Sequence, residues 1–232
     1  MAKTKKRGLT FRVFRFSAKL LILLIAVSVI KVFAVRFINP PVTMPVIVIR
    51  VHNLFSSEDI VVPGGEWKEI RDISPHLVRA VLAAEDQRFM SHRGFDYHEM
   101  SNTVKDIIKG KRIRGASTIT MQMARSVFLW KGRHMTRKLL EAYYTVLIET
   151  FMPKVRIMEL YLNTVDWGTG IIGAEAASKK YFHKSASELT PEEAALMAAI
   201  LPNPHSWSPV RPGRYVLSRQ KSILKNMGKM HL

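Results

Sequence analysis

A long apolar run near the N-terminus constrains this chain more than any other feature. Leu20 to Ile30 carries no charge, and after Lys31 the apolar sequence resumes as Val32 to Val35. A membrane-spanning helix needs about 20 mostly apolar residues. Residues 18–38 meet this requirement if the side chains of Lys31 and Arg36 reach toward the interface. The pattern therefore predicts a transmembrane helix over residues 20–38.

The residues before this run are strongly basic and indicate its orientation. Positive charge stays on the cytoplasmic side, so residues 1–19 are expected to form a cytoplasmic tail and residues from about Asn39 to lie outside the membrane. A cleaved signal peptide is the competing interpretation, but no small-x-small cleavage site follows the apolar run. A buried core helix is disfavoured by the basic flank. The basic residues are Lys3, Lys5, Lys6, Arg7, Arg12, Arg15 and Lys19.

Charge and cysteine content narrow the function classes. The chain of 232 residues has a formal net charge of +18 and no cysteine. Without cysteine there is no disulfide, no thiolate metal site and no cysteine nucleophile. Such a positive charge indicates a polyanionic partner, which is a nucleic acid, an anionic membrane surface or a phosphorylated substrate.

Residues 39–72 are predicted to form a linker with a short β segment. Prolines keep the chain after Asn39 out of a helix. Val46 to Val51 is predicted as a strand, pairing with Ile60 to Val62 ahead of the turn at Pro63 to Gly65. From Ser74 onward the periodicity is helical, so we expect a mainly α domain over residues 73–232. Its predicted helices begin after Ser74 and from Thr118 and Thr190, and cover 98–109, 154–163, 174–182 and 215–227.

One predicted helix runs directly into a pair of carboxylates. Ser74 and Pro75 are typical of a helix start, and apolar residues lead from there to Glu85 and Asp86. A carboxylate where a buried helix opens into a loop can face a cleft with a raised pKa. The plainer interpretation is a solvated helix end, and composition does not decide between them.

A later segment could bind an anion. A helix capped by Ser117 or Thr118 would offer free backbone N–H groups, with Gln122 and Arg125 on one of its faces. The alternative is an ordinary capped amphipathic helix. Farther along, the spacing of Arg137 and Glu141 is usually that of a helix-surface ion pair.

Five ordered motifs resemble the signatures of the peptidoglycan glycosyltransferases, the lysozyme-like domain of bifunctional penicillin-binding proteins. The first two are Glu85-Asp86-x-x-Phe89-x-x-His92-x-Gly94 and Gly115-Ala116-Ser117-Thr118-Ile119-Thr120-x-Gln122 with Arg125. The others are Arg137-Lys138-x-x-Glu141, Lys154-x-x-Ile157-Met158-Glu159-x-Tyr161-Leu162-Asn163 and Arg219-x-x-x-Ile223-Leu224. The segment Trp130 to Arg133 is most similar to the monofunctional members. Met121 replaces a glutamine of the family pattern, and Arg125 replaces a lysine, which changes a point charge into a planar fork.

The resemblance implies a lysozyme-like helical domain that polymerises lipid II into glycan strands. The donor is the growing strand, α-linked to undecaprenyl pyrophosphate, and the acceptor is the 4-hydroxyl of lipid II. One direct displacement inverts the anomeric carbon and releases undecaprenyl pyrophosphate. It also implies a single-pass protein of the bacterial inner membrane, contact with membrane lipid and no nucleic-acid partner, and leaves other cell-wall synthesis proteins open as partners.

The same resemblance implies roles for particular residues. A base must take the proton of the acceptor hydroxyl, and Glu85 is assigned to it. Glu141 is expected to hold the arginines or a divalent cation, Mg²⁺ or Mn²⁺, at the donor pyrophosphate. The expected substrate-binding residues are Asp86, Phe89, His92, Ser117, Thr118, Gln122, Arg125, Arg133, Arg137 and Lys138. Within this set Asp86 and His92 are expected to shape their loop. No metal site is predicted, because His92, Asp96 and His98 match no known ligand spacing.

Two rival classes are weighed against this interpretation. A lysozyme-like hydrolase would also use a buried glutamate, but water attack on a glycan releases no pyrophosphate for the cations to bind. A nucleic-acid-binding membrane protein would explain the charge and leave Glu85 and Glu141 without a role. Ser-x-x-Lys occurs at Ser218 and Ser222 without the companion motifs of penicillin-binding domains, and no further domain fits before Leu232, so a monofunctional enzyme is expected.

Overall fold

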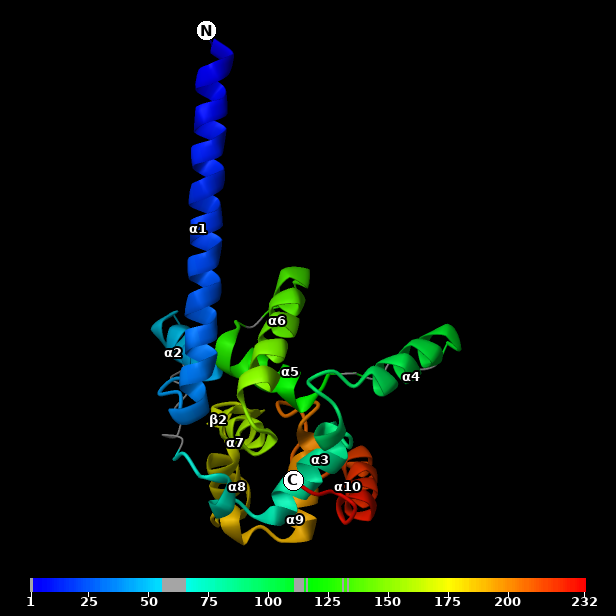
Figure 1. Cartoon of the computed structure of the whole chain (residues 1–232). Helices are drawn as coiled ribbons and strands as arrows, with labels where there is room; N and C mark the ends of the chain where they lie inside the picture. The colour runs from blue at the N-terminus through cyan, green and yellow to red at the C-terminus, as the bar shows by residue number, and fades with distance from the viewer. Residues whose placement is uncertain (1, 56–65, 111–114, 116, 131, 133) are drawn as a thin grey trace. The chain divides into compact units, whose positions relative to one another are not determined.

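The computed structural model describes residues 2–55, 66–110, 115, 117–130, 132 and 134–232. The chain divides into two compact units, Met1–Ile38 and Asn39–Leu232. In the described part of the second unit, regular structure is helical apart from one pair of short strands (Figure 1). This confirms the mainly α class expected from the sequence.

The first unit is a single helix, α1, Ala2–Phe37. Its segment Phe11–Phe37, of 27 residues with mean hydropathy 2.5, is long and apolar enough to cross a membrane. At about 1.5 Å per residue it reaches ~40 Å, more than the hydrocarbon thickness of a bilayer. Only 11% of the apolar window is buried, which contradicts the alternative of a buried core helix. The basic N-terminal residues continue into the apolar run as one helix.

The segment predicted as a strand over residues 46–51 is helical, so that prediction is wrong. It lies within α2, Met44–Phe55, and Pro45 falls in its first turn, where proline's fixed φ suits a helix. A short apolar run cannot be assigned by periodicity alone. A helix satisfies its backbone hydrogen bonds internally, whereas a strand needs a neighbour. The proposed partner, residues 60–62, and the turn at 63–65 lie outside the described residues.

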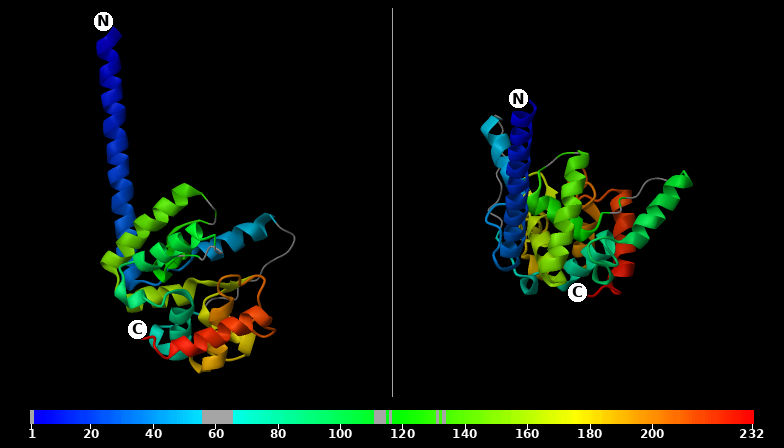
Figure 2. Two further views of the ribbon diagram at one scale, coloured as in Figure 1. Left: turned by 90° about the vertical axis from the view of Figure 1, so that its right-hand side faces the viewer. Right: turned by 45° about the horizontal axis from the view of Figure 1, so that its top comes forward.

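Three helices far apart in the sequence form one part of the core. They are α3 (Pro75–Glu85), α9 (Pro191–Ile200) and α10 (Arg214–Met227), which pack on one another (Figures 1 and 2). The predicted capping box at the start of α9 is confirmed, with the Thr190 hydroxyl accepting from the Glu193 N–H and the Glu193 carboxylate accepting from the Thr190 N–H. The buried alanines of α9 let its neighbours approach closely, which places α10 beside the end of α3.

The second part of the core is centred on α5. This helix, Ile119–Phe128, packs against α6 (Met135–Phe151) and α7 (Lys154–Thr164). An antiparallel pair, β1 (Asp166–Gly168) and β2 (Ile171–Ile172), leads into α8 (Ala174–Phe182). Gly173 joins them at φ +87°, and a Cβ there would lie 2.9 Å from the Asn163 carbonyl oxygen. Short 3₁₀ turns are η1 (Ile70–Asp72), η2 (Phe89–Ser91) and η3 (Ala186–Glu188).

Helix α4 carries no buried residue. α4, Tyr97–Ile108, begins at the Asp96 cap within one residue of its predicted start and stands away from the other helices (Figure 1). Its exposed apolar side chains recur at helical spacing and form one face. They are Tyr97, Met100, Val104, Ile107 and Ile108. This face is available to an apolar environment outside the domain.

Candidate active site

Glu85 is the last residue of α3 and lies at the centre of the candidate site. Ser74 caps the helix, accepting from the His76 N–H and donating to the Leu189 carbonyl, with Pro75 in the first turn. The helix buries Leu77, Val78, Val81 and Leu82 against the core. The Glu85 side chain is only 13% exposed. Of the two interpretations that composition left open, the structure agrees with the largely buried carboxylate and contradicts the solvated helix end.

Groups from two other helices reach the Glu85 carboxylate. Nε2 of Gln122, on α5, donates to Glu85 Oε2 at 3.0 Å, and the Arg219 guanidinium, on α10, lies 3.7 Å from Oε1. Burial raises the pKa of Glu85, and the neighbouring Asp86 charge adds to this. The Gln122 hydrogen bond and the charges of Arg219 and Arg125 oppose the rise in pKa. The result is a carboxylate of increased basicity held by a fixed donor.

Asp86 ties the loop after α3 to the start of α5. Its carboxylate oxygens lie 2.9 and 3.1 Å from His92 Nε2, and Oδ2 also accepts from the Ile119 N–H at 3.1 Å. The Thr118 hydroxyl, which caps α5, donates to the Gly94 carbonyl at 2.6 Å. Gly94 has φ +87°, and a Cβ there would lie 2.5 Å from Thr145 Cγ2. This network sets the position of Glu85 relative to Gln122.

Asp86, His92 and Asp96 form a buried group whose spacing alone could hold a metal ion, since one ligand atom of each lies within 4.8 Å of the others. Both ring nitrogens of His92 are nevertheless in use. His92 Nδ1 accepts from the Gly94 N–H and Nε2 faces Asp86, which places the ring proton on Nε2. Asp96 Oδ1 accepts from the Glu99 N–H at the start of α4. A resident metal does not fit this arrangement, and no chemical step is derived from one.

Arg137 and Glu141 form a buried ion pair on α6. Arg137 Nη1 lies 2.8 Å from Glu141 Oε2, and their side chains are 8% and 5% exposed. The spacing along the helix suggested a surface ion pair. Because the pair is buried, losing one partner would cost much more folding stability. Arg137 Nε has no hydrogen-bond partner among the described residues. A buried donor without a partner is costly, so this guanidinium is suited to binding an anion that arrives with a substrate.

The remaining expected site residues fall into three groups. Phe89 is fully buried, and Asp86, His92 and Thr118 bond within the protein, which fits the shaping of the site. Ser117, Arg125 and Lys138 are exposed and accessible to a substrate. Arg133 lies outside the described residues.

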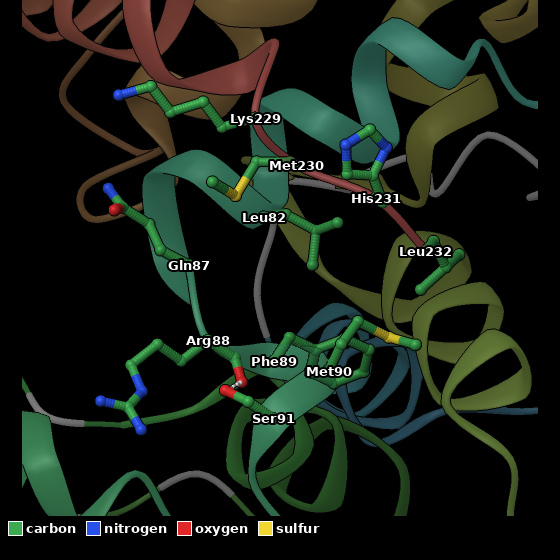
Figure 3. Close-up of a pocket in the computed structure, with 10 residues that line it drawn as sticks. All are labelled: Leu82, Gln87, Arg88, Phe89, Met90, Ser91, Lys229, Met230, His231 and Leu232. Carbon is green, nitrogen blue, oxygen red and sulfur yellow. Dashed lines mark hydrogen bonds between the residues drawn. The ribbon is translucent and has the colours of Figure 1, made fainter.

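The cavity of about 440 Å³ shown in Figure 3 lies beside this centre and does not include it. It is lined by Leu82, residues 87–91 and residues 229–232. Neither Glu85 nor Gln122 contributes to its lining, so its location does not define the reaction centre. The candidate site consists of the Glu85 carboxylate, its hydrogen bonds and the surrounding arginines.

A comparison with known proteins decides the family. The family described as Transglycosylase matches residues 58–228, which is most of the chain and includes all the residues of the site. The chain belongs to the transglycosylase family. The site at the end of α3 therefore lies within a transglycosylase domain.

Curated relatives of this transglycosylase are similar over nearly the whole chain. A protein of Caulobacter vibrioides named biosynthetic peptidoglycan transglycosylase is 46% identical over 90% of this chain and 88% of its own length. Proteins of the same name from Shewanella oneidensis and Bdellovibrio bacteriovorus are each 44% identical, over 94% and 92% of this chain and 93% and 85% of their own lengths.

Sequence reasoning missed two residues that lie at the candidate site. Arg219 was noted in the fifth motif but not as a neighbour of Glu85, and Tyr161 was noted in the fourth motif without a role. The signal for both was present in the motifs. What was absent was any indication that α10 and α7 bring these side chains to α3 and α5.

The fourth motif also secures the chain entering the domain. The Glu159 carboxylate accepts from the Ile70 N–H at 2.9 Å. The Asn163 side chain accepts from the Lys68 N–H and donates to the Lys68 carbonyl. Glu159 and Asn163 thus hold the segment at 68–70 against α7, which accounts for their part of the motif without a role in chemistry.

Proposed function

We propose that this transglycosylase is a monofunctional peptidoglycan glycosyltransferase of cell-wall synthesis, which polymerises lipid II and releases undecaprenyl pyrophosphate. Its family and the names of its relatives support the class of reaction. The observation that carries the mechanism is the buried Glu85 carboxylate, held by Gln122 and facing Arg219. This combination suits deprotonation of a sugar hydroxyl beside a departing phosphate.

Glu85 acts as the general base. A sugar 4-hydroxyl is a poor nucleophile near neutral pH, so its proton must leave as the glycosidic bond forms. Burial raises the pKa of Glu85 and brings its basicity closer to the operating pH, while Gln122 and the arginines keep part of the population ionised. The hydroxyl oxygen then attacks the anomeric carbon of the donor, and the bond to pyrophosphate breaks on the opposite face, inverting the configuration.

Cationic side chains stabilise the pyrophosphate leaving group. Charge builds on its oxygens in the transition state, so fixed donors lower the barrier most. Arg137 has a buried Nε–H with no partner in the described part of the chain, and Glu141 orients its guanidinium. Arg125 and Lys138 are exposed and add positive charge, with Arg133 and Ser117 as further contacts. A divalent cation, Mg²⁺ or Mn²⁺, bound to the pyrophosphate would add further positive charge there.

The substrate lipid implies a membrane location for the reaction. α1 is compatible with a single-pass anchor in the inner membrane, and the apolar face of α4 suits contact with lipid. Residues 1–19 would lie in the cytoplasm and residues 73–232 would form the catalytic domain in the periplasm.

The assay that tests this function supplies lipid II to the full chain in detergent or vesicles. We expect long uncross-linked strands that a muramidase digests to monomeric disaccharide-peptides, with no covalent label from penicillin. The same protein incubated with finished glycan should leave its length unchanged. Shortening of that glycan would instead indicate a hydrolase, and peptide dimers or a penicillin adduct would refute monofunctionality.

Polymerisation activity should decrease at acidic pH, and the decrease should begin at a pH above the ordinary pKa of a glutamate. Only ionised Glu85 accepts a proton, and burial raises its pKa above 4.5. Below that raised pKa, kcat should decrease about tenfold per pH unit. Since the folded state binds this proton more tightly than the unfolded chain, Glu85 stabilises the fold at low pH and that contribution is lost as pH rises through its folded pKa.

The measurement is kcat at saturating lipid II from pH 4.5 to 8, with circular dichroism at each pH to follow folding. The charges of Asp86, Arg125 and Arg219 also influence the pKa of Glu85, and these residues are unchanged in the protein measured at every pH. Full activity down to pH 4.5 in the folded protein would remove Glu85 from the role of base.

The membrane orientation can be tested with a reporter at the C-terminus. A fusion after Leu232 should be active only if the reporter functions in the periplasm, because the basic residues before the apolar run keep the N-terminus inside. A paired reporter that functions only in the cytoplasm is the control. Activity of the cytoplasmic reporter would overturn the proposed topology.

A further inference from the structure

Tyr161 is a polar side chain in the core beside the proposed base. It lies on α7, its exposed fraction is 0%, and its hydroxyl donates to Gln122 Oε1 at 3.2 Å. A buried phenol hydroxyl requires an acceptor, and the Gln122 amide supplies one. Burial, with the charge of Glu85 as a further cause, raises the pKa of Tyr161 well above its usual range. The phenol therefore keeps its proton and remains a donor.

The Gln122 amide has two unlike ends, and both are in use. Its oxygen accepts from Tyr161, and its nitrogen donates to Glu85 Oε2 at 3.0 Å. A carboxylate that is to act as a base has only acceptors to offer. If the amide turned over, its oxygen would face the carboxylate and its NH₂ group would face Tyr161. The ionised carboxylate can only accept, so it requires the NH₂ group, and the Tyr161 hydroxyl holds the amide in that orientation by donating to its oxygen.

We propose that Tyr161 is a positioning residue for the transfer reaction, whose hydroxyl fixes the Gln122 amide so that its NH₂ group holds the Glu85 carboxylate. The inference rests on the proposed function of Glu85 as base. Arg219 lies farther from Glu85, at 3.7 Å, and its Nε–H donates to the Ala199 carbonyl. It does not duplicate the short contact made by Gln122, so loss of the amide orientation would loosen the base.

A double-mutant cycle on the full chain tests whether Tyr161 acts on Glu85 through Gln122. Tyr161→Phe removes one oxygen and keeps the ring, and Gln122→Met removes both ends of the amide while keeping a long side chain. We expect Tyr161→Phe to lower kcat about tenfold, the scale of one lost hydrogen bond, with KM for lipid II unchanged. Gln122→Met should lower kcat at least as much. Because Tyr161 acts through Gln122, the double variant should be no slower than Gln122→Met alone.

A matched control separates positioning from stability. Tyr181 is a half-buried tyrosine whose hydroxyl donates to the Trp167 carbonyl at 2.8 Å, away from Gln122. Tyr181→Phe also loses one hydrogen bond and should keep the kcat of the parent, while thermal melting is recorded for every variant. Should Tyr161→Phe fail to fold, Tyr161→Met enters the same cycle as a second side chain without a hydroxyl.

The outcomes distinguish the positioning role of Tyr161 from the role of Glu85 as general base. Multiplicative losses in the double variant, an unchanged kcat in Tyr161→Phe, or equal losses in Tyr161→Phe and Tyr181→Phe would each overturn the positioning role. Any of these results, together with an inactive Glu85→Gln, leaves the proposed base intact. An active Glu85→Gln in the same assay would overturn the proposed function itself.

Discussion

Replacing Glu85 by glutamine is expected to lower the rate of lipid II polymerisation by at least about 10²-fold, the usual scale for the loss of one general base. Glutamine keeps the size and hydrogen-bonding capacity of the side chain but cannot take the proton of the acceptor hydroxyl. Folding should not suffer, because the substitution removes a charge whose burial raises its pKa. We therefore expect a melting temperature at neutral pH that is nearly unchanged.

The measurement is single-turnover and steady-state polymerisation of lipid II, with donor binding followed separately. Glu192→Gln is the matched control, since this carboxylate is exposed in the first turn of α9 and should leave the rate unaltered. A folded Glu85→Gln variant that retains polymerisation would place the base elsewhere.

The second large effect is expected at the Arg137–Glu141 pair. Glu141→Ala leaves the Arg137 cation buried without its partner, and breaking such a pair costs about 3–5 kcal/mol of folding stability. This is much more than the ~0–1 kcal/mol expected from a surface pair. Polymerisation should also be lost, because the guanidinium that Glu141 orients would no longer face the leaving group.

A double replacement separates the two consequences. Arg137→Met with Glu141→Leu removes both charges and fills a similar volume, so thermal unfolding should recover much of the lost stability. Its polymerisation rate should stay at least about 10²-fold below that of the parent, because a donor for developing charge has gone. Glu69→Ala, which breaks the exposed Glu69–Arg71 pair, is the control for both measurements. Restored activity in the stable double variant would show that Arg137 does not act on the pyrophosphate.

Helix boundaries in this protein follow largely from local chemistry. Ser74 with Pro75, and Thr190 with Glu193, are caps whose hydrogen bonds involve residues two or three positions apart, and the structure shows both. Local chemistry did not settle residues 46–51. Their apolar side chains suit a strand or a helix equally, and the choice depends on what surrounds them.

In the candidate site, too, some features follow from local sequence and others depend on tertiary packing. Resemblance of the motifs to a known family identified Glu85, Gln122, Arg137 and Glu141 as candidates, since each motif is local in the chain. Their interactions depend on which helices meet. That Arg137 and Glu141 are buried depends on the packing of α6, which spacing along a helix cannot reveal.

The sequence by itself determined the apolar N-terminal helix, the capped helices and the residue types available for the reaction, because these depend on composition and on neighbours within one or two turns. Only the tertiary structure decided that α7 and α10 bring Tyr161 and Arg219 to the Gln122–Glu85 pair. Those contacts arise from burying apolar faces of helices that are distant in the chain. Burial also changes the chemistry of what it encloses, raising the pKa of Glu85 by removing its carboxylate from water.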